Sequence, residues 1–320
     1  MPSEPHTGVK KVLALSGGVG GAKLDLGLYH ILKPWQLSIV VNTGDDFQHL
    51  GLTICPDMDT IMYTLSGNAD EEKGWGLTNE TWSCLNQLKD LGASSWFGLG
   101  DRDLAIHLHR TEQMRAGKSL SDITAELFSS FSVKANVYPM SNQPVGTIVH
   151  TQDGRDLPFQ RYFVEERCSP KVRGFSYSGS DAPAPADQIL KLIGDPDLQA
   201  IVVCPSNPFV SINPILSIKG VRQALCAARV PIVAVSPLVG GQAVKGPLAA
   251  MLAEMGMAVS NTSIVNQYKD FLSGIVIDTC DADDIDRLGV PTLARNTVMK
   301  SLDDKKNLAQ ALLDFADQLR

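Results

Sequence analysis

Short, continuously apolar segments recur along the chain, and each is followed by a turn and a longer stretch with the spacing of an amphipathic helix. The five clearest segments are residues 12–15, 37–41, 200–204, 232–235 and 274–277. Strands that are apolar on both faces belong to parallel sheets covered by helices on each side. The pattern predicts an α/β fold with a doubly wound, mostly parallel, Rossmann-like sheet, and we expect residues 1–320 to form a single domain.

The middle of the chain has a different pattern. Its apolar and polar side chains alternate in three segments, residues 133–138, 145–150 and 160–164. Such alternation is typical of antiparallel strands with one solvated face. We expect a small antiparallel β-rich insertion at about residues 131–175, after which a loop rich in glycine, serine and proline (residues 174–187) returns the chain to the main sheet.

A glycine-rich loop directly follows the first predicted strand. It contains Gly17, Gly18, Val19, Gly20 and Gly21, and Lys23 follows shortly afterwards. Glycines permit positive φ angles and close backbone approach, so several N–H groups can point at one anion beside the positive end of the next helix. The spacing matches neither the Walker A motif nor G-x-G-x-x-G. We expect these residues to bind a phosphate or diphosphate, and a tight turn without a ligand is the alternative.

Acidic residues follow the second predicted strand and open the next predicted helix. They are Asp45, Asp46, Asp57 and Asp59. Loops at the carboxyl ends of parallel strands lie together, so these carboxylates should approach the glycine loop. A divalent cation would keep carboxylates and phosphate together, and we expect Mg²⁺ bound by Asp45 and Asp59. Helix capping is the alternative for Asp57 and Asp59, and a hydrogen bond within its own loop is the alternative for Asp46.

Later loops also carry side chains suited to ligands. Arg102 lies between two aspartates and can present its planar fork to a phosphate or a ring carbonyl, with a surface ion pair as the alternative. Ser206 and Asn207 lie between two prolines after a core strand, which suits reading a purine edge or capping a turn. The polar turn at residues 236–247 repeats this theme, and we expect weaker ligand contacts there.

Charge and composition restrict the partners. The net charge of −7 argues against nucleic acid, because counterion release requires a basic surface. Residues 1–9 lack the apolar core of a signal peptide, and no apolar run approaches the ~20 residues that span a bilayer. We therefore expect a cytoplasmic protein without a membrane partner. The six cysteines are scattered without a C-x-x-C pair, so we expect free thiols, and His107 and His109 should be structural.

Seven spaced segments, taken in order, resemble a known family. They are GGVGGAKL, VVNTGDDFQHLGLTICPDMDTIMYTLSG, GWGLTNETW, WFGLGDRDLAIHLHR, VKANVYPMS, PSNPFVSINPIL and VSPLVGG. The series is similar to the 2-phospho-L-lactate transferase family of coenzyme F-420 (deazaflavin) biosynthesis, from the first strand to about Phe271 and more loosely through the last helix. Val19, Gly21 and Ala22 stand where some family members carry threonine and proline.

The resemblance implies the reaction and its substrates. A phosphate-linked lactyl, enolpyruvyl or glyceryl acid would pass from a guanosine diphosphate donor to the hydroxyl of the deazaflavin Fo (7,8-didemethyl-8-hydroxy-5-deazariboflavin), with Mg²⁺ and with release of GMP. The family's acidic and Fo-contacting positions fall on Asp45, Asp59 and Arg102. The glycine loop and the Ser206-Asn207 turn match the nucleotide end.

Phosphoryl-type transfer depends on positioning and charge stabilisation, so no Ser-His-Asp triad is expected. Asp45 and Asp59 would act through the metal, and Asp46 or Asp57 would orient the acceptor hydroxyl. The candidates to cover the flat deazaflavin ring, with core packing as the alternative, are Trp75, Trp82 and Trp96. We expect a homodimer, the commonest state of such enzymes. The alternative function is a nucleotide-sugar-binding regulator of the same fold without catalysis.

Overall fold

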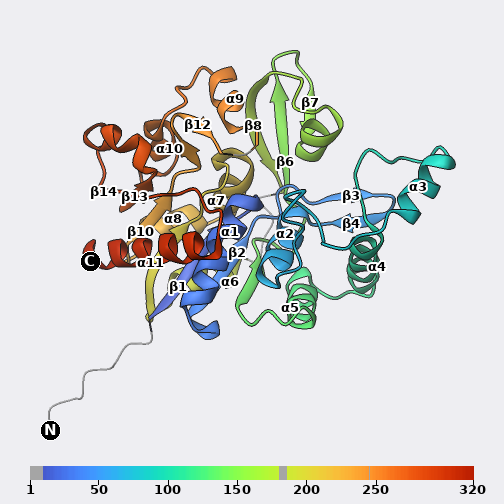
Figure 1. Ribbon diagram of the computed structural model, residues 1–320, viewed down its shortest axis with the longest axis horizontal. Coiled ribbons are helices and arrows are strands. Elements are labelled where there is room, and N and C mark those ends of the chain that lie inside the picture. The colour runs from blue at the N-terminus through green and yellow to red at the C-terminus, as the bar shows by residue number, and fades with distance from the viewer. Residues whose placement is uncertain (1–9, 180–185, 245) are drawn as a thin grey trace, which may run out of the picture.

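The computed structural model describes residues 10–179, 186–244 and 246–320, and a seven-stranded sheet forms its centre (Figure 1). The strand order is β14-β13-β10-β9-β1-β2-β5, and every neighbouring pair is parallel. The strands are β1 (Lys11–Ser16), β2 (Leu37–Val41), β5 (Asn136–Pro139), β9 (Leu198–Val203), β10 (Ile232–Val235), β13 (Gly274–Ile277) and β14 (Thr292–Ala294). The predicted doubly wound α/β fold is confirmed, and each of the five predicted parallel strands is present.

Helices cover both faces of this sheet. The first face packs against α1 (Gly18–Ile31), α2 (Pro56–Leu65), α5 (Leu120–Ser130) and α11 (Leu302–Gln318). The second packs against α6 (Ala186–Ile193), α7 (Asn213–Ser217), α8 (Val221–Cys226), α9 (Leu248–Glu254) and α10 (Asn261–Tyr268). In β1, Val12 and Ala14 enter the first core, and Leu13 and Leu15 enter the second. Burial on both faces explains why the central strands are continuously apolar.

The middle of the chain differs in part from the prediction. β5 lies within the predicted insertion, yet it pairs with β2 and forms an edge of the main sheet. A separate antiparallel sheet has the order β7-β6-β8 and consists of β6 (Gly146–Thr151), β7 (Asp156–Pro158) and β8 (Val172–Ser178). Residues 174–178 of the predicted return loop therefore belong to β8, and residues 180–185 lie outside the described chain.

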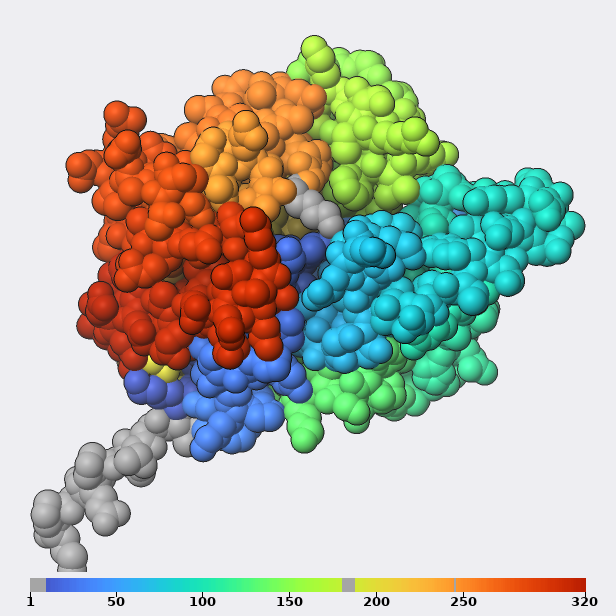
Figure 2. Space-filling model, viewed as in Figure 1, coloured from blue at the N-terminus to red at the C-terminus, as the bar shows by residue number. Residues whose placement is uncertain are grey.

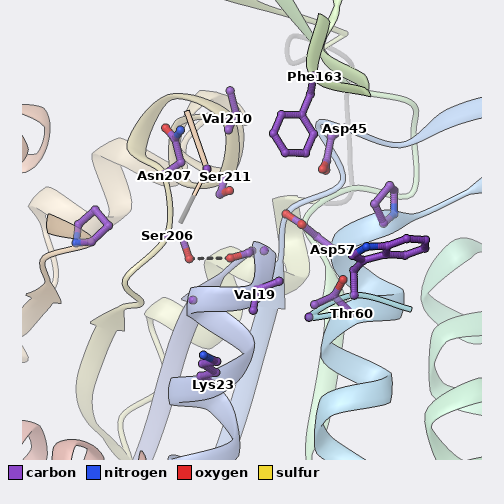
Figure 3. A pocket seen from close by; sticks show the side chains of 18 of the residues that line it. Val19, Lys23, Asp45, Asp57, Thr60, Phe163, Ser206, Asn207, Val210 and Ser211 are labelled. Carbon is purple, nitrogen blue, oxygen red and sulfur yellow. Dashed lines mark hydrogen bonds between the residues drawn. The ribbon is translucent and has the colours of Figure 1, made fainter. Parts of the chain in front are cut away.

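The predicted strand at residues 160–164 is wrong. Arg161–Glu165 forms a helical turn, η2, and the rings of Phe159 and Phe163 stack with their centroids 5.4 Å apart. Residues four apart are about 6 Å apart along a helix but about 13 Å apart along a strand, so rings at this distance require a helical turn. The turn buries Tyr162 and directs Phe163 toward the carboxyl edge of the main sheet (Figure 3).

A lobe of short elements follows β2 in the chain (Figure 1). It contains the hairpin of β3 (Phe47–His49) and β4 (Leu52–Ile54), followed by α3 (Ser83–Asp90) and α4 (Asp101–Arg115). The remaining elements are η1 (Pro34–Gln36), η3 (Pro208–Ile212), β11 (Leu238–Val239), β12 (Gln242–Ala243) and η4 (Thr279–Arg287). All six cysteines are free thiols. Within the described ranges, no helix combines the length and the apolar character that a membrane crossing requires.

A buried carboxyl group joins α1 to the sheet. Asp25 is inaccessible to solvent, accepts a hydrogen bond from the Ser16 hydroxyl at 2.5 Å, and lies 3.5 Å from the Cys204 thiol. Burial raises the pKa of Asp25 to about 7, although both hydrogen bonds oppose the rise. The carboxyl group therefore connects the helix to the ends of two neighbouring strands, just beneath the glycine loop.

Candidate active site

A pocket of about 740 Å³ lies at the carboxyl edge of the main sheet. The loops that follow β1, β2, β9 and β10 all contribute to its lining. Figure 2 shows the surface hollowed there, between the blue, cyan, green and orange parts of the chain. Ligands of doubly wound sheets bind at this edge, near the point where the chain switches from one half of the sheet to the other. Here that switch lies between β1 and β9.

The glycine loop forms the bottom of the pocket. The N-cap of α1 is Gly17, and Gly18 has a φ of +62°, a conformation that favours glycine. A Cβ atom on Gly20 would lie 2.2 Å from the carbonyl oxygen of Pro205, so the helix can approach this turn only with glycine there. Gly17, Gly18, Val19, Gly20 and Lys23 line the pocket, and their binding of phosphate stays a prediction.

Gly21 does not line the pocket. A Cβ atom there would lie 2.4 Å from the Ser16 hydroxyl oxygen and 2.8 Å from that of Ser206. The residue thus allows α1 to pack closely on two strand ends and does not face a ligand. The alternative of a tight structural turn applies to Gly21, whereas Gly17 to Gly20 line the pocket.

The Ser206-Asn207 turn lies against the glycine loop. The Ser206 hydroxyl donates to the carbonyl oxygen of Gly17 at 2.7 Å, as the dashed line in Figure 3 shows. The side chain of Asn207 accepts from the Phe209 backbone N–H at 3.0 Å and thereby caps η3. Both residues line the pocket, but the capped-turn alternative also holds for Asn207. Their side chains therefore organise the loop and also line the pocket.

Two pocket carboxylates share one amide group. Asn42 Nδ2 donates to Asp45 Oδ1 at 2.8 Å and to Asp57 Oδ2 at 2.9 Å, while Gln160 donates to Asp45 Oδ2 at 3.2 Å. Asp57 is not the predicted helix cap, because Cys55 is the N-cap of α2. Burial raises the pKa of Asp57 to about 6. Burial, followed by the charge of Asp57, raises the pKa of Asp45 well above its ordinary range.

The other two predicted carboxylates are placed differently. Asp46 does not line the pocket; its carboxylate contacts the Cys55 thiol, and burial raises its pKa well above the ordinary range. Asp59 lines the pocket, but both of its oxygens face the guanidinium of the buried Arg110. Asp59 is therefore held apart from the Asp45–Asp57 pair as the partner of an arginine. Neither Arg110 nor Asn42 was predicted as part of the site.

Aromatic side chains form one wall of the pocket. They are Tyr63, Trp75, Phe97, Phe159 and Phe163. Trp75 is 48% exposed, and its ring meets that of Trp82 edge-on at 6.2 Å. Trp82 and Trp96 do not line the pocket, and Trp96 packs on Phe47 and His49. Of the three candidate tryptophans, Trp75 alone faces the pocket, and the other two have packing roles.

Arg102 is exposed and lies outside the pocket lining. Its guanidinium donates to the carbonyl oxygen of Thr78 at 2.7 Å. Glu80 accepts the backbone N–H groups of Arg102 and Asp103, and Asp101 accepts those of Ser83 and Cys84. The start of α4 thus anchors residues 78–84, which follow the segment that carries Trp75.

The C-terminal half of the chain supplies the opposite wall. Ser236, Pro237, Gly246 and Pro247 from the predicted polar turn line the pocket, and Lys245 lies outside the described residues. A strap of residues 297–300 also lines it. Asp278, at the end of β13, holds this strap by accepting the Thr297 backbone N–H at 2.8 Å and its hydroxyl at 3.1 Å.

Two lysines, Lys23 and Lys300, line the pocket between these walls. Burial, and secondarily the positive charge of Lys305, lowers the pKa of Lys23. His107, predicted to be structural, is buried and also borders the pocket, with Nε2 3.3 Å from Asp103 Oδ1. The site thus has a glycine and lysine end, a carboxylate pair beside it, and an aromatic wall.

A solved member of the UPF0052 family from Bacillus halodurans superposes with a TM-score of 0.63 at 17% identity, covering 95% of this chain and 98% of that one. A likeness at this identity establishes the fold. Assigning a family to the site formed by the glycine loop and the carboxylates requires relatives of higher sequence identity.

Such relatives match over nearly their whole length. A phosphoenolpyruvate transferase from Kitasatospora aureofaciens is 36% identical over 97% of this chain and 99% of its own. A 2-phospho-L-lactate transferase from Methanosarcina mazei is 37% identical over 94% of this chain and 99% of its own. The family model described as 2-phospho-L-lactate transferase CofD matches residues 12–298, which include the pocket residues from the glycine loop to the beginning of the strap. The chain therefore belongs to the 2-phospho-L-lactate transferase CofD family.

Proposed function

We propose that this transferase of coenzyme F-420 biosynthesis joins a phosphate-linked three-carbon acid, carried on guanosine diphosphate, to the hydroxyl of Fo. The observation that carries the proposal is a pocket that combines an anion-binding end with an aromatic wall. A diphosphate and a flat heterocycle could then lie side by side. The names of the relatives support a lactyl and an enolpyruvyl acid equally. The relative named a phosphoenolpyruvate transferase is 36% identical to this chain, and the one named a 2-phospho-L-lactate transferase is 37% identical.

The donor diphosphate would lie at the start of α1. The backbone N–H groups of Gly18, Val19 and Gly20 are at the positive end of the helix, where anions are favoured. Lys23 adds a charge one turn along the same helix. The nucleoside would extend toward the Ser206-Asn207 turn and the strap, because these form the wall opposite the aromatic residues.

Asp45 and Asp57 fit a bound Mg²⁺ better than the predicted pair of Asp45 and Asp59. They are two buried carboxylates on one amide, beside the glycine loop, and their mutual repulsion has no described cation to offset it. Asp59 already has a cationic partner in Arg110. When bound, Mg²⁺ would neutralise charge on the donor diphosphate.

Asp45 is also placed to orient the acceptor. Figure 3 shows it between Phe163 and Asp57, where the aromatic wall meets the phosphate end. The Fo hydroxyl would donate a hydrogen bond to Asp45 while its oxygen attacks the phosphorus that bears the acid. The new P–O bond forms, the bond to GMP breaks, and the hydroxyl proton is released toward Asp45. The fixed loops supply positioning, which accounts for much of such a reaction.

The proposal is tested by direct product analysis. Purified protein is incubated with Fo, Mg²⁺ and the lactyl, enolpyruvyl and glyceryl guanosine diphosphate donors in parallel, and the products are identified by mass spectrometry. We expect GMP and one phosphodiester-linked deazaflavin in equal amounts. Binding of nucleotide in thermal-shift assays without turnover of any donor would instead support the regulator and refute the transferase assignment.

A further inference from the structure

A buried arginine organises the polar side of the aromatic wall. Arg110 on α4 is 1% exposed, and Nη1 donates to Asp59 Oδ2 at 3.1 Å while Nη2 makes a shorter contact with Oδ1. Nη1 also lies 3.0 Å from His107 Nδ1 and 3.4 Å from the Thr53 carbonyl oxygen. The guanidinium is planar and its donors have fixed directions. One side chain therefore sets the orientation of two residues that line the pocket, although Arg110 itself does not line it.

The arginine also sets the protonation pattern behind the wall. Because a guanidinium only donates, His107 Nδ1 must accept, and the neutral imidazole carries its proton on Nε2. That nitrogen lies 3.3 Å from Asp103 Oδ1 without hydrogen-bond geometry, and Asp103 Oδ1 accepts a hydrogen bond from the Tyr63 hydroxyl. Arg110, Asp59, His107, Asp103 and Tyr63 form a connected set, which we call the Arg110 cluster. Its four outer members line the pocket.

The spacing of the cluster also resembles a cation site. Ligand atoms of Asp59, Asp103 and His107 lie within 4.8 Å of one another. The Arg110 guanidinium already pairs with Asp59 and occupies His107 Nδ1, so a metal ion at these atoms would face its positive charge at short range. In this cluster the arginine supplies the cation. Asp59 is left as an oriented hydrogen-bond acceptor at the pocket surface.

We infer that Arg110 is a positioning residue for the acceptor, acting through Asp59 and His107 without touching substrate. The inference rests on the proposed function and deepens it. The ring of a polar heterocycle carries N–H and carbonyl groups at its edge, and fixed partners recognise such an edge at little entropic cost. The Arg110 cluster holds those partners rigid beside the aromatic wall.

The test combines Arg110→Lys, Asp59→Asn and the double variant, with Fo and the donor varied separately. Lysine keeps the charge but loses the bidentate fork. We expect the KM for Fo to rise by about tenfold to hundredfold, as for lost supporting contacts elsewhere, while the donor KM and the Mg²⁺ dependence stay within about twofold. In the double variant, Arg110→Lys should raise the KM for Fo little beyond the value for Asp59→Asn alone, because Arg110 acts mainly through the Asp59 carboxylate.

Arg115→Lys is the matched control, since Arg115 is on the same helix but contacts only the Gly51 carbonyl among its described hydrogen bonds. It should leave both KM values unchanged. Circular dichroism and the melting temperature show whether each variant folds. If Arg110→Lys does not fold, His107→Gln is measured in its place, and it should raise the KM for Fo without raising the KM for the donor. A folded variant with an unchanged Fo KM, or with a rise in the donor KM alone, would overturn the inference.

Two readouts separate this inference from the proposed function. If the wild-type protein turns over no donor with Fo, the proposed function fails on that observation. Independently, ¹⁵N spectra of labelled histidine should show His107 as the Nε2–H tautomer, and an Nδ1–H tautomer would contradict the role assigned to Arg110.

Discussion

Replacing Asp25 with asparagine should stabilise the protein above neutral pH. Asp25 is completely buried, and burial raises its pKa from 3.8 to about 7. The folded protein therefore holds this proton more tightly than the unfolded chain, so stability falls as the pH rises from about 4 to about 7. One pKa unit corresponds to ~1.4 kcal/mol, so the loss approaches roughly 4 kcal/mol of unfolding free energy above pH 7.

Asparagine has no charge to bury and can still accept the Ser16 hydrogen bond. The variant should therefore lack this pH-dependent loss. We expect the difference in unfolding free energy, variant minus wild type, to grow by about 1 kcal/mol per pH unit between about pH 5 and 7 and then to level off. Urea unfolding followed by circular dichroism at about pH 5, 6, 7 and 8 measures this difference.

Asp286→Asn serves as the control, because Asp286 is exposed on η4. Its effect on stability should be small and nearly constant over the same range. Asp25→Ala separates the charge from the hydrogen bond, since it removes both. A difference between wild type and Asp25→Asn that stays flat from about pH 5 to 8 would refute the reasoning, because ionisation of the buried group would then not limit stability.

Three further perturbations probe the pocket. Gly20→Ala would place a Cβ atom 2.2 Å from the Pro205 carbonyl oxygen. We therefore expect the unfolding free energy to fall by about 1–3 kcal/mol and GDP to bind more weakly. Gly174→Ala is the control, because a Cβ atom there meets no other atom within 4 Å, and it should change neither quantity. Asp57→Asn should raise the Mg²⁺ concentration for half-maximal activity at least about tenfold, and an unchanged Mg²⁺ titration would remove Asp57 from the metal site. Trp75→Ala should raise the KM for Fo, by about tenfold for the loss of an aromatic contact, and equal effects on Fo and donor KM would count against a stacking role.

The sequence was sufficient to predict the sheet and the position of the pocket. Strands that are continuously apolar must be buried on both faces, which a parallel sheet between two layers of helices achieves. In that topology the loops that follow the strands lie together at one edge of the sheet. Gly17 to Gly20, Asp45, Asp59 and the Ser206-Asn207 turn line the pocket, as this argument places them, whereas Gly21 does not. β5 was assigned to the insertion because its alternating pattern reflects an edge strand with one partly covered face.

The partners of the carboxylates could not be predicted in the same way. Arg110 meets Asp59 across 51 positions of sequence, and a polar helix gives no sign that one of its arginines is fully buried. Asn42 could have been found, because an amide directly after a buried strand and before a run of acids is placed to hold them. The family resemblance gives Arg102 a role but no orientation; its guanidinium bonds to the Thr78 carbonyl outside the pocket lining, and its contact with Fo stays a prediction.

The strand order has a consequence for how substrate preference can diverge among relatives. Residues before α6 build β2, β5 and the aromatic wall, whereas residues after it build β9 to β14 and the strap, with β1 and the glycine loop at the junction. If the proposed function holds, acceptor recognition and nucleoside recognition are encoded in successive blocks of the sequence. A single crossover near the start of α6, between a phosphoenolpyruvate transferase and a 2-phospho-L-lactate transferase, would exchange one half of the pocket as a unit. Such chimeras can assign the determinants of donor choice to one block or the other before any single contact with the donor is mapped.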